Sequence, residues 1–159
     1  MATQSKGKKF EQQIREDFEK VLNVSIDRLP DQTMRYRGAT NVSDFIVYKE
    51  PYEYYIECKT TKGASLSFNN IKDGQWDKLP PKSEIQGVFA GILCWFYDKD
   101  VTKFIPIQLL QDMRDKGLKS VRYDIESDEV VTLKGKKKRT FYTYDMEDFF
   151  NQMEKLKRR

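Results

Sequence analysis

Histidine is absent from this chain of 159 residues. Histidine supplies the general base of Ser-His-Asp hydrolases, of HNH-type nucleases and of nucleases with a histidine relay, so these chemistries are excluded. Zinc sites that contain histidine are excluded as well. Any metal site in this chain is therefore expected to hold a hard cation through oxygen ligands.

Cysteine is scarce, with Cys58 and Cys94 as its two members. Two cysteines cannot complete a zinc site without carboxylates. Both lie in segments that we predict to be strands. We interpret them as buried free thiols, which fits a reducing compartment.

Long apolar runs are missing too. No segment has the apolar length that spans a membrane, and the lysine-rich first residues contain no apolar core of a signal peptide. We therefore predict a cytoplasmic protein without a membrane segment.

The composition favours a single domain over residues 1–159, with 34% charged and 13% aromatic residues. The net charge of +4 is small, but basic residues are concentrated at 134–139 and 155–159. Such blocks suit a polyanion such as nucleic acid, although exposed basic tails are also common.

Apolar residues at helical spacing, together with helix-ending residues, predict helices over 8–22, 70–79, 108–116 and 146–156. Pro80 is expected to end the second of these helices. The first and last are amphipathic, and their apolar sides could pack in the core or form part of a dimer interface.

Runs of β-branched and aromatic residues predict strands over 44–48, 52–61, 85–97, 103–107, 121–125 and 130–133. The first two are expected to form an antiparallel hairpin. The run 85–97 is apolar almost throughout, which is typical of a central strand covered on both faces. Residues 23–42 are expected to hold a short strand or turn and then a loop, and 134–139 a connecting loop.

Glu57 and Lys59 lie two residues apart in the predicted strand 52–61. The period of two places both on one face, while Ile56 and Cys58 point to the other face and into the core. The hairpin would bring Asp44 beside Glu57, where two carboxylates repel unless a cation lies between them. Magnesium suits such a pair, since it takes one or two carboxylates and keeps several waters.

Lys59 would then hold the attacking water, offset charge on the phosphate or, if its pKa is lowered, act as a base. The alternative for Glu57 and Lys59 is an ordinary neighbouring pair of charges on a surface strand.

Several segments resemble the PD-(D/E)XK nuclease superfamily and, within it, the RecU-type Holliday junction resolvases of Gram-positive bacteria and their phages. These segments are residues 7–11, 43–45, 55–62 and 65–71, together with Gln75. Ser43 stands where the superfamily's name has proline, and no segment corresponds to the protruding stalk that RecU-type enzymes insert into the junction.

The resemblance implies an α/β (α+β) fold, with a restriction-endonuclease-like mixed sheet flanked by helices. The implied order is α-β-β-β-α-β-β-α, followed by extra C-terminal strands and a helix. It also implies that Asp44, Glu57 and the carbonyl of Cys58 bind Mg²⁺ or Mn²⁺, with Lys59 as the catalytic lysine. Glu11 would be an outer ligand or a water-positioning acid, and Gln75 would reach the site from the following helix. From the residues alone, Glu11 and Gln75 are equally consistent with ordinary helix surface positions.

The implied function is metal-dependent cleavage of branched DNA, in particular of four-way junctions, by a homodimer whose two-fold symmetry matches paired cuts. The alternatives are another nuclease of the superfamily, in restriction or DNA-end processing, a DNA-binding module without catalysis, and a scaffold that binds a partner through its aromatic hairpin. The predicted DNA contacts are basic and hydroxyl side chains in loops: Arg35, Arg37, Lys62, Ser65, Ser67, Lys136, Lys137, Lys138 and Arg139.

Overall fold

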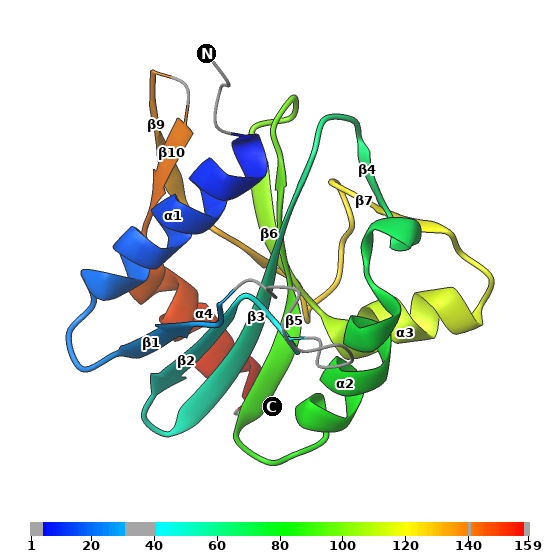
Figure 1. The fold of residues 1–159 in the computed structure, drawn as a ribbon, viewed down its shortest axis with the longest axis horizontal. Helices are drawn as coiled ribbons and strands as arrows, with labels where there is room; N and C mark the ends of the chain where they lie inside the picture. The colour runs from blue at the N-terminus through cyan, green and yellow to red at the C-terminus, as the bar shows by residue number, and fades with distance from the viewer. Residues whose placement is uncertain (1–4, 31–40, 140, 158–159) are drawn as a thin grey trace.

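A six-stranded mixed sheet forms the centre of the protein in a computed structural model that describes residues 5–30, 41–139 and 141–157 (Figure 1). Its strand order is β1-β2-β3-β5-β6-β8, in which β3 and β5 are parallel and the other neighbours antiparallel. The predicted mixed sheet flanked by helices is confirmed. The strands are β1 Ser25–Arg28, β2 Phe45–Lys49, β3 Tyr52–Thr61, β5 Val88–Phe96, β6 Val101–Pro106 and β8 Val131–Thr132.

Helices cover both faces of this sheet (Figure 1). Helices α1 (Lys6–Glu19) and α4 (Met146–Lys157) pack on one face, and α2 (Asp73–Ser83) and α3 (Ile107–Asp115) pack on the other. Strand β5 is buried along its whole length, as predicted for a central strand. None of the helices in the described part of the chain is long and apolar enough to cross a membrane.

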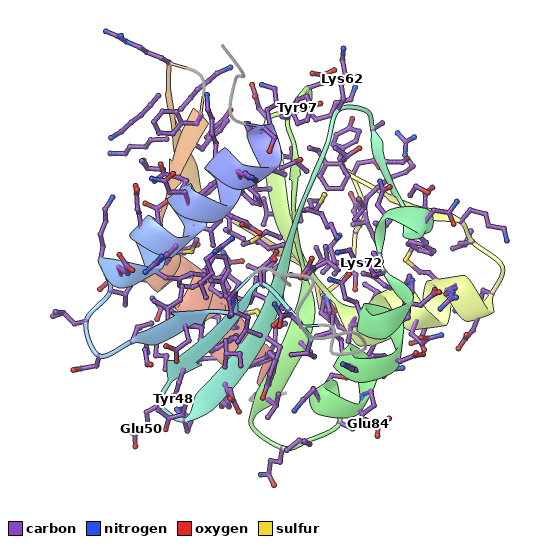
Figure 2. All side chains as sticks on the ribbon, viewed as in Figure 1. Tyr48, Glu50, Lys62, Lys72, Glu84 and Tyr97 are labelled. Carbon is purple, nitrogen blue, oxygen red and sulfur yellow. The ribbon has the colours of Figure 1, made fainter. Side chains whose placement is uncertain are left out.

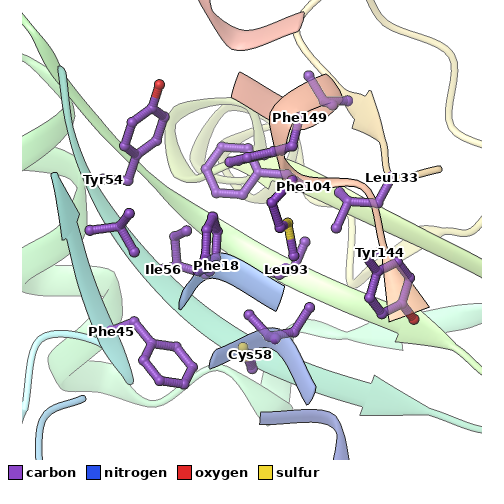
Figure 3. Packing of buried hydrophobic residues seen from close by; sticks show 14 of the residues in the cluster. Phe18, Phe45, Tyr54, Ile56, Cys58, Leu93, Phe104, Leu133, Tyr144 and Phe149 are labelled. Carbon is purple, nitrogen blue, oxygen red and sulfur yellow. The ribbon is translucent and has the colours of Figure 1, made fainter. Parts of the chain in front are cut away.

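Strand β3 divides its side chains between two hydrophobic clusters. Tyr54, Ile56 and Cys58 belong to the cluster beneath α1 and α4 (Figure 3). Tyr55 belongs to the cluster beneath α2 and α3. This confirms the predicted period of two and places Glu57 and Lys59 on the Tyr55 face. The apolar sides of α1 and α4 are buried in the first cluster, so they stabilise the monomer core and are not free for a dimer interface.

Helices α1 and α2 begin or end at residues other than the predicted ones. Helix α1 ends at Glu19, before residue 22, and Asn23 then takes a left-handed φ of 59°. Helix α2 begins at Asp73, after a short 3₁₀ turn over Phe68–Asn70, and continues through both prolines to Ser83. Proline inside a helix removes a donor and crowds the preceding turn, but its fixed φ is helical, and here the helix continues only to Ser83, three residues after Pro80. Helix α3 ends as predicted before Gly117, whose φ is +87°.

Two short strand pairs lie outside the main sheet. Strand β9 (Gly135–Lys138) pairs antiparallel with β10 (Phe141–Tyr144), and β4 (Ser65–Ser67) pairs with β7 (Ser120–Arg122). The prediction of a loop over 134–139 was therefore wrong. All of β9 is exposed, so it lacks the alternating apolar residues that normally indicate a strand.

The buried carboxylate of Asp17 holds α1 against the β9–β10 hairpin. One oxygen accepts a hydrogen bond from Gln13 Nε2 at 2.9 Å, and the other accepts from the backbone N–H of Tyr144 at 2.9 Å. Because α1 is fixed in this way, the residues along it have defined positions relative to the sheet.

Gly91 lies where β5 and β6 approach most closely. A Cβ at this position would lie 2.5 Å from the carbonyl oxygen of Ile105 and 2.8 Å from Phe104 Cζ. We expect Gly91→Ala to lower the free energy of unfolding by roughly 3 kcal/mol, because backbone must shift to relieve the overlap. Urea unfolding measures this change. Gly63→Ala is the matched control, since a Cβ there meets no atom within 4 Å, and an equal loss in the control would contradict the explanation.

Candidate active site

Asp44 lies at the bend just before β2, and the β2–β3 hairpin brings it to Glu57. Phe45, the first residue of β2, pairs with Ile56 of β3, so Asp44, which precedes Phe45, lies next to Glu57. The backbone N–H of Cys58 donates a hydrogen bond to Asp44 Oδ2 at 2.8 Å. The predicted hairpin is therefore confirmed, and it fixes the orientation of the Asp44 carboxylate.

Lys59 and Glu57 form an ion pair, with 3.3 Å between Lys59 Nζ and Glu57 Oε1. The two side chains are only 16% and 8% exposed, respectively. A surface pair would be solvated and would add little stability. This pair is largely removed from water, so the interpretation as ordinary surface charges does not hold.

Glu11 reaches the same cluster from α1. Its negative charge acts on the carboxyl group of Asp44 and raises the pKa of that group, and its carboxylate lies 3.4 Å from the guanidinium of Arg28 on β1. Sequence reasoning missed Arg28. Sequence periodicity does not indicate it: Arg28 reaches the site through the β1–β2 register, which pairs it with Phe45, the neighbour of Asp44.

The three carboxyl groups crowd a partly buried site. Burial, followed by the negative charges of Glu57 and Glu11, raises the pKa of Asp44 to about 8, although the N–H of Cys58 acts in the opposite direction. Burial also raises the pKa of the Cys58 thiol, so this sulfur is a neutral group of the core. Asp44 therefore carries a proton near neutral pH unless a cation replaces it.

This donor set fits a hard divalent cation. The predicted ligands are the carboxylates of Asp44 and Glu57 and the carbonyl of Cys58, all of which are oxygen donors, and magnesium commonly takes one or two carboxylates and completes its shell with water. Within the described residues, no group of three or more histidine, cysteine, aspartate or glutamate side chains is arranged as a metal site. The assignment of metal ligands remains a prediction.

Gln75 is buried in the first turn of α2, where its Oε1 accepts a hydrogen bond from the backbone N–H of Lys72 at 3.1 Å. This bond caps the helix and explains why α2 begins where it does. The structure thus gives Gln75 a structural role, and its reach into the active site remains a prediction.

The predicted DNA contacts fall in three places. Lys62 is exposed in the turn after β3 (Figure 2), whereas Ser65 and Ser67 belong to β4 instead of the predicted turn, and Ser67 Oγ accepts from the N–H of Asn69. Four further candidates lie on the exposed hairpin strand β9 and the turn that follows it: Lys136, Lys137, Lys138 and Arg139. Arg35 and Arg37 lie outside the described residues.

Cys58 and Cys94 are both buried free thiols, as predicted. Their Cα atoms lie on neighbouring strands, where Cys58 pairs with Leu93 and Lys59 pairs with Cys94. The pKa of Cys94 is raised by burial, as for Cys58. Neither thiol is placed to act as an exposed nucleophile.

Comparison of the sequence with protein families and with curated proteins finds no match. Among solved structures, the fold is similar to that of Hjc, a Holliday junction resolvase from the archaeal hyperthermophile Archaeoglobus fulgidus. The similarity covers 65% of this chain and 78% of that chain, with 17% sequence identity and a TM-score of 0.49. The roles considered below for the site residues accordingly rest on the geometry and on the sequence motif.

Proposed function

We propose that this protein is a metal-dependent endonuclease that cuts four-way DNA junctions, with Mg²⁺ or Mn²⁺ as its cofactor. The observation that carries the proposal is the cluster of Asp44, Glu57 and Lys59 on adjacent strands, with Lys59 3.3 Å from Glu57. A module that only binds DNA has no need of two crowded carboxylates that force a proton onto Asp44.

Each residue has a distinct task in this proposal. Asp44 and Glu57 would hold the metal ion, which supplies Lewis-acid activation of water and of the scissile phosphate when bound. The N–H of Cys58 keeps the Asp44 carboxylate oriented. The ammonium group of Lys59, positioned by Glu57, holds the attacking water or stabilises negative charge on the phosphate. Glu11, paired with Arg28, orients water at the edge of the site.

The choice of branched DNA rests on the resemblance to RecU-type resolvases. Junction resolution needs paired cuts on opposed strands, so we propose a homodimer whose two-fold axis coincides with that of the junction. The terminal helices are used in the monomer core, so the dimer interface is expected on another surface.

The test is cleavage of a synthetic four-way junction beside a linear duplex with the sequence of two of its arms. We expect symmetric nicks in the junction with Mg²⁺ or Mn²⁺, complete loss of cutting with chelator, and at least roughly tenfold slower cutting of the duplex, a difference of about 1.4 kcal/mol in activation free energy. Equal cutting of both substrates would instead indicate a nuclease for restriction or DNA-end processing. Junction binding without any cutting would leave only the DNA-binding module.

A further inference from the structure

A cleft of about 440 Å³ lies at the end of the sheet where β5 and β6 are joined. The start of α1, the turn after β3 and the β9–β10 hairpin surround it. Figure 2 shows two of its residues, Lys62 and Tyr97, at this end of the molecule. The cleft is separate from the cluster of Asp44 and Glu57 and contains none of its carboxylates.

Aromatic rings form the lining of the cleft toward the core. The indole ring of Trp95 lies 5.6 Å from the ring of Tyr97 and 6.4 Å from the ring of Tyr142. Trp95 is only 5% exposed, and its Nε1 is the one buried side-chain nitrogen or oxygen in the described part of the protein without a hydrogen-bond partner. An unpaired buried donor is costly, so the contacts of Trp95 with the core leave one polar group of this ring unsatisfied.

Cationic side chains form the outer lining. Lys6 Nζ lies 4.9 Å from the centre of the Tyr97 ring, and Lys62, Lys137 and Arg139 also line the cleft. Asp98 and Asp100 add two negative charges, but Asp100 is paired with Lys137 at 3.4 Å. The cations therefore outnumber the acids, and a polyanion is the ligand whose charge matches.

We propose that this cleft binds a single-stranded segment of the DNA substrate, with a base stacked on Tyr97 in place of the Lys6 ammonium and the neighbouring phosphates held by the displaced Lys6 and by Lys62. Aromatic platforms beside a basic groove are the usual means of holding single strands, because every base has a face that can stack. A base within a duplex has both faces covered by its neighbours and cannot stack on Tyr97. The proposal deepens the proposed nuclease function and rests on it, since the base pairs where the strands of a branched substrate exchange lose continuous stacking and open more easily than those within an arm.

The cleft lies near the end of β3 that carries Lys59. Lys62 follows the end of β3, and Lys59 lies three residues earlier on the same strand. At about 3.3 Å per residue the two positions are roughly 10 Å apart. Lys59 faces the α2 side of the sheet and the cleft lies on the α1 side, so a strand held at Lys59 for cutting would pass around this end of the sheet and would need more than about three nucleotides, at about 3.4 Å per stacked nucleotide, to reach the cleft.

The test is binding of an oligothymidine strand that carries one 2-aminopurine, measured in chelator so that no cutting occurs. We expect Tyr97→Leu to raise Kd for the single strand roughly tenfold and to abolish the quenching of 2-aminopurine that stacking causes, while Kd for a duplex of equal length is unchanged. Tyr97→Phe keeps the ring and is expected to bind as the parent does. Thermal unfolding checks that both variants are folded.

Tyr123 provides the matched control. Its ring has a similar cation partner, with Lys99 Nζ at 5.2 Å from the ring centre, but it does not line the cleft. Tyr123→Leu is expected to bind the single strand as the parent does. Unchanged single-strand binding by Tyr97→Leu, or an equal loss on duplex or in the control, would overturn the proposal. The binding measurement requires no cutting, so it tests the cleft even if the nuclease assay fails.

Discussion

Glu57→Gln is expected to reduce the rate of junction cleavage by roughly 10³-fold or more and to leave junction binding within about twofold of the parent. Glutamine keeps the size of the side chain but removes the charge that would bind the cation in the proposed site and that pairs with Lys59 Nζ at 3.3 Å. We expect binding to be maintained because, in the proposed function, it depends on phosphate contacts by basic residues away from this carboxylate. Single-turnover cleavage and gel-shift titration with the same labelled junction measure the two effects.

Glu53→Gln is the matched control for this experiment. Glu53 lies on the same strand as Glu57 and points to the same face of the sheet, but it pairs with Tyr48 at the far end of the β2–β3 hairpin. We expect its cleavage rate to equal that of the parent. If Glu57→Gln cuts at the parent rate, the active site is misassigned, and a parallel loss of binding would show that Glu57 acts through folding instead of chemistry.

The central part of the site could be predicted because two periodic rules determine it. The period of two in β3 requires Glu57 and Lys59 to share a face, and a tight hairpin requires Asp44 to approach Glu57. Neither rule depends on the rest of the fold. The buried environment that distinguishes this pair from a surface pair was not predictable, since it comes from helices packed on both faces.

The remaining features depend on contacts between segments far apart in the sequence. Arg28 pairs with Glu11 only because β1 joins the edge of the sheet beneath α1. Asp17 is buried because it caps a backbone group of β10, which lies 127 residues away along the chain. Charged residues at these positions carry no apolar pattern, so sequence periodicity gives no indication of either contact.

Asp44→Asn is expected to abolish cleavage and yet to stabilise the metal-free protein at pH 8. The pKa of Asp44 is about 8 in the folded protein and 3.8 in the unfolded chain, so the folded state binds the proton more tightly. The stabilisation of the folded state that comes from this proton is present in full below about pH 4 and is lost as the pH rises through 8. Asparagine has no such proton, so we expect equal stability near pH 4 and an advantage of at least about 1 kcal/mol for the variant at pH 8.

Divalent metal should narrow this difference. At pH 8, Mg²⁺ replaces the proton in the parent and is expected to raise its free energy of unfolding by about 2 kcal/mol at a concentration some thirtyfold above Kd, whereas Asp44→Asn gains little. Urea unfolding between pH 4 and 8.5, with chelator and with Mg²⁺, measures both trends. Asp124→Asn is the control, because the neighbouring Arg122 lowers the pKa of Asp124 and no gain at pH 8 is expected.

Parallel pH curves for the parent and Asp44→Asn in chelator would show that no proton is held at Asp44. Equal stabilisation of the parent and Asp44→Asn by Mg²⁺ would place the metal away from Asp44. The pH dependence in chelator thus tests the crowding of the carboxylates, and the effect of Mg²⁺ tests their use as metal ligands.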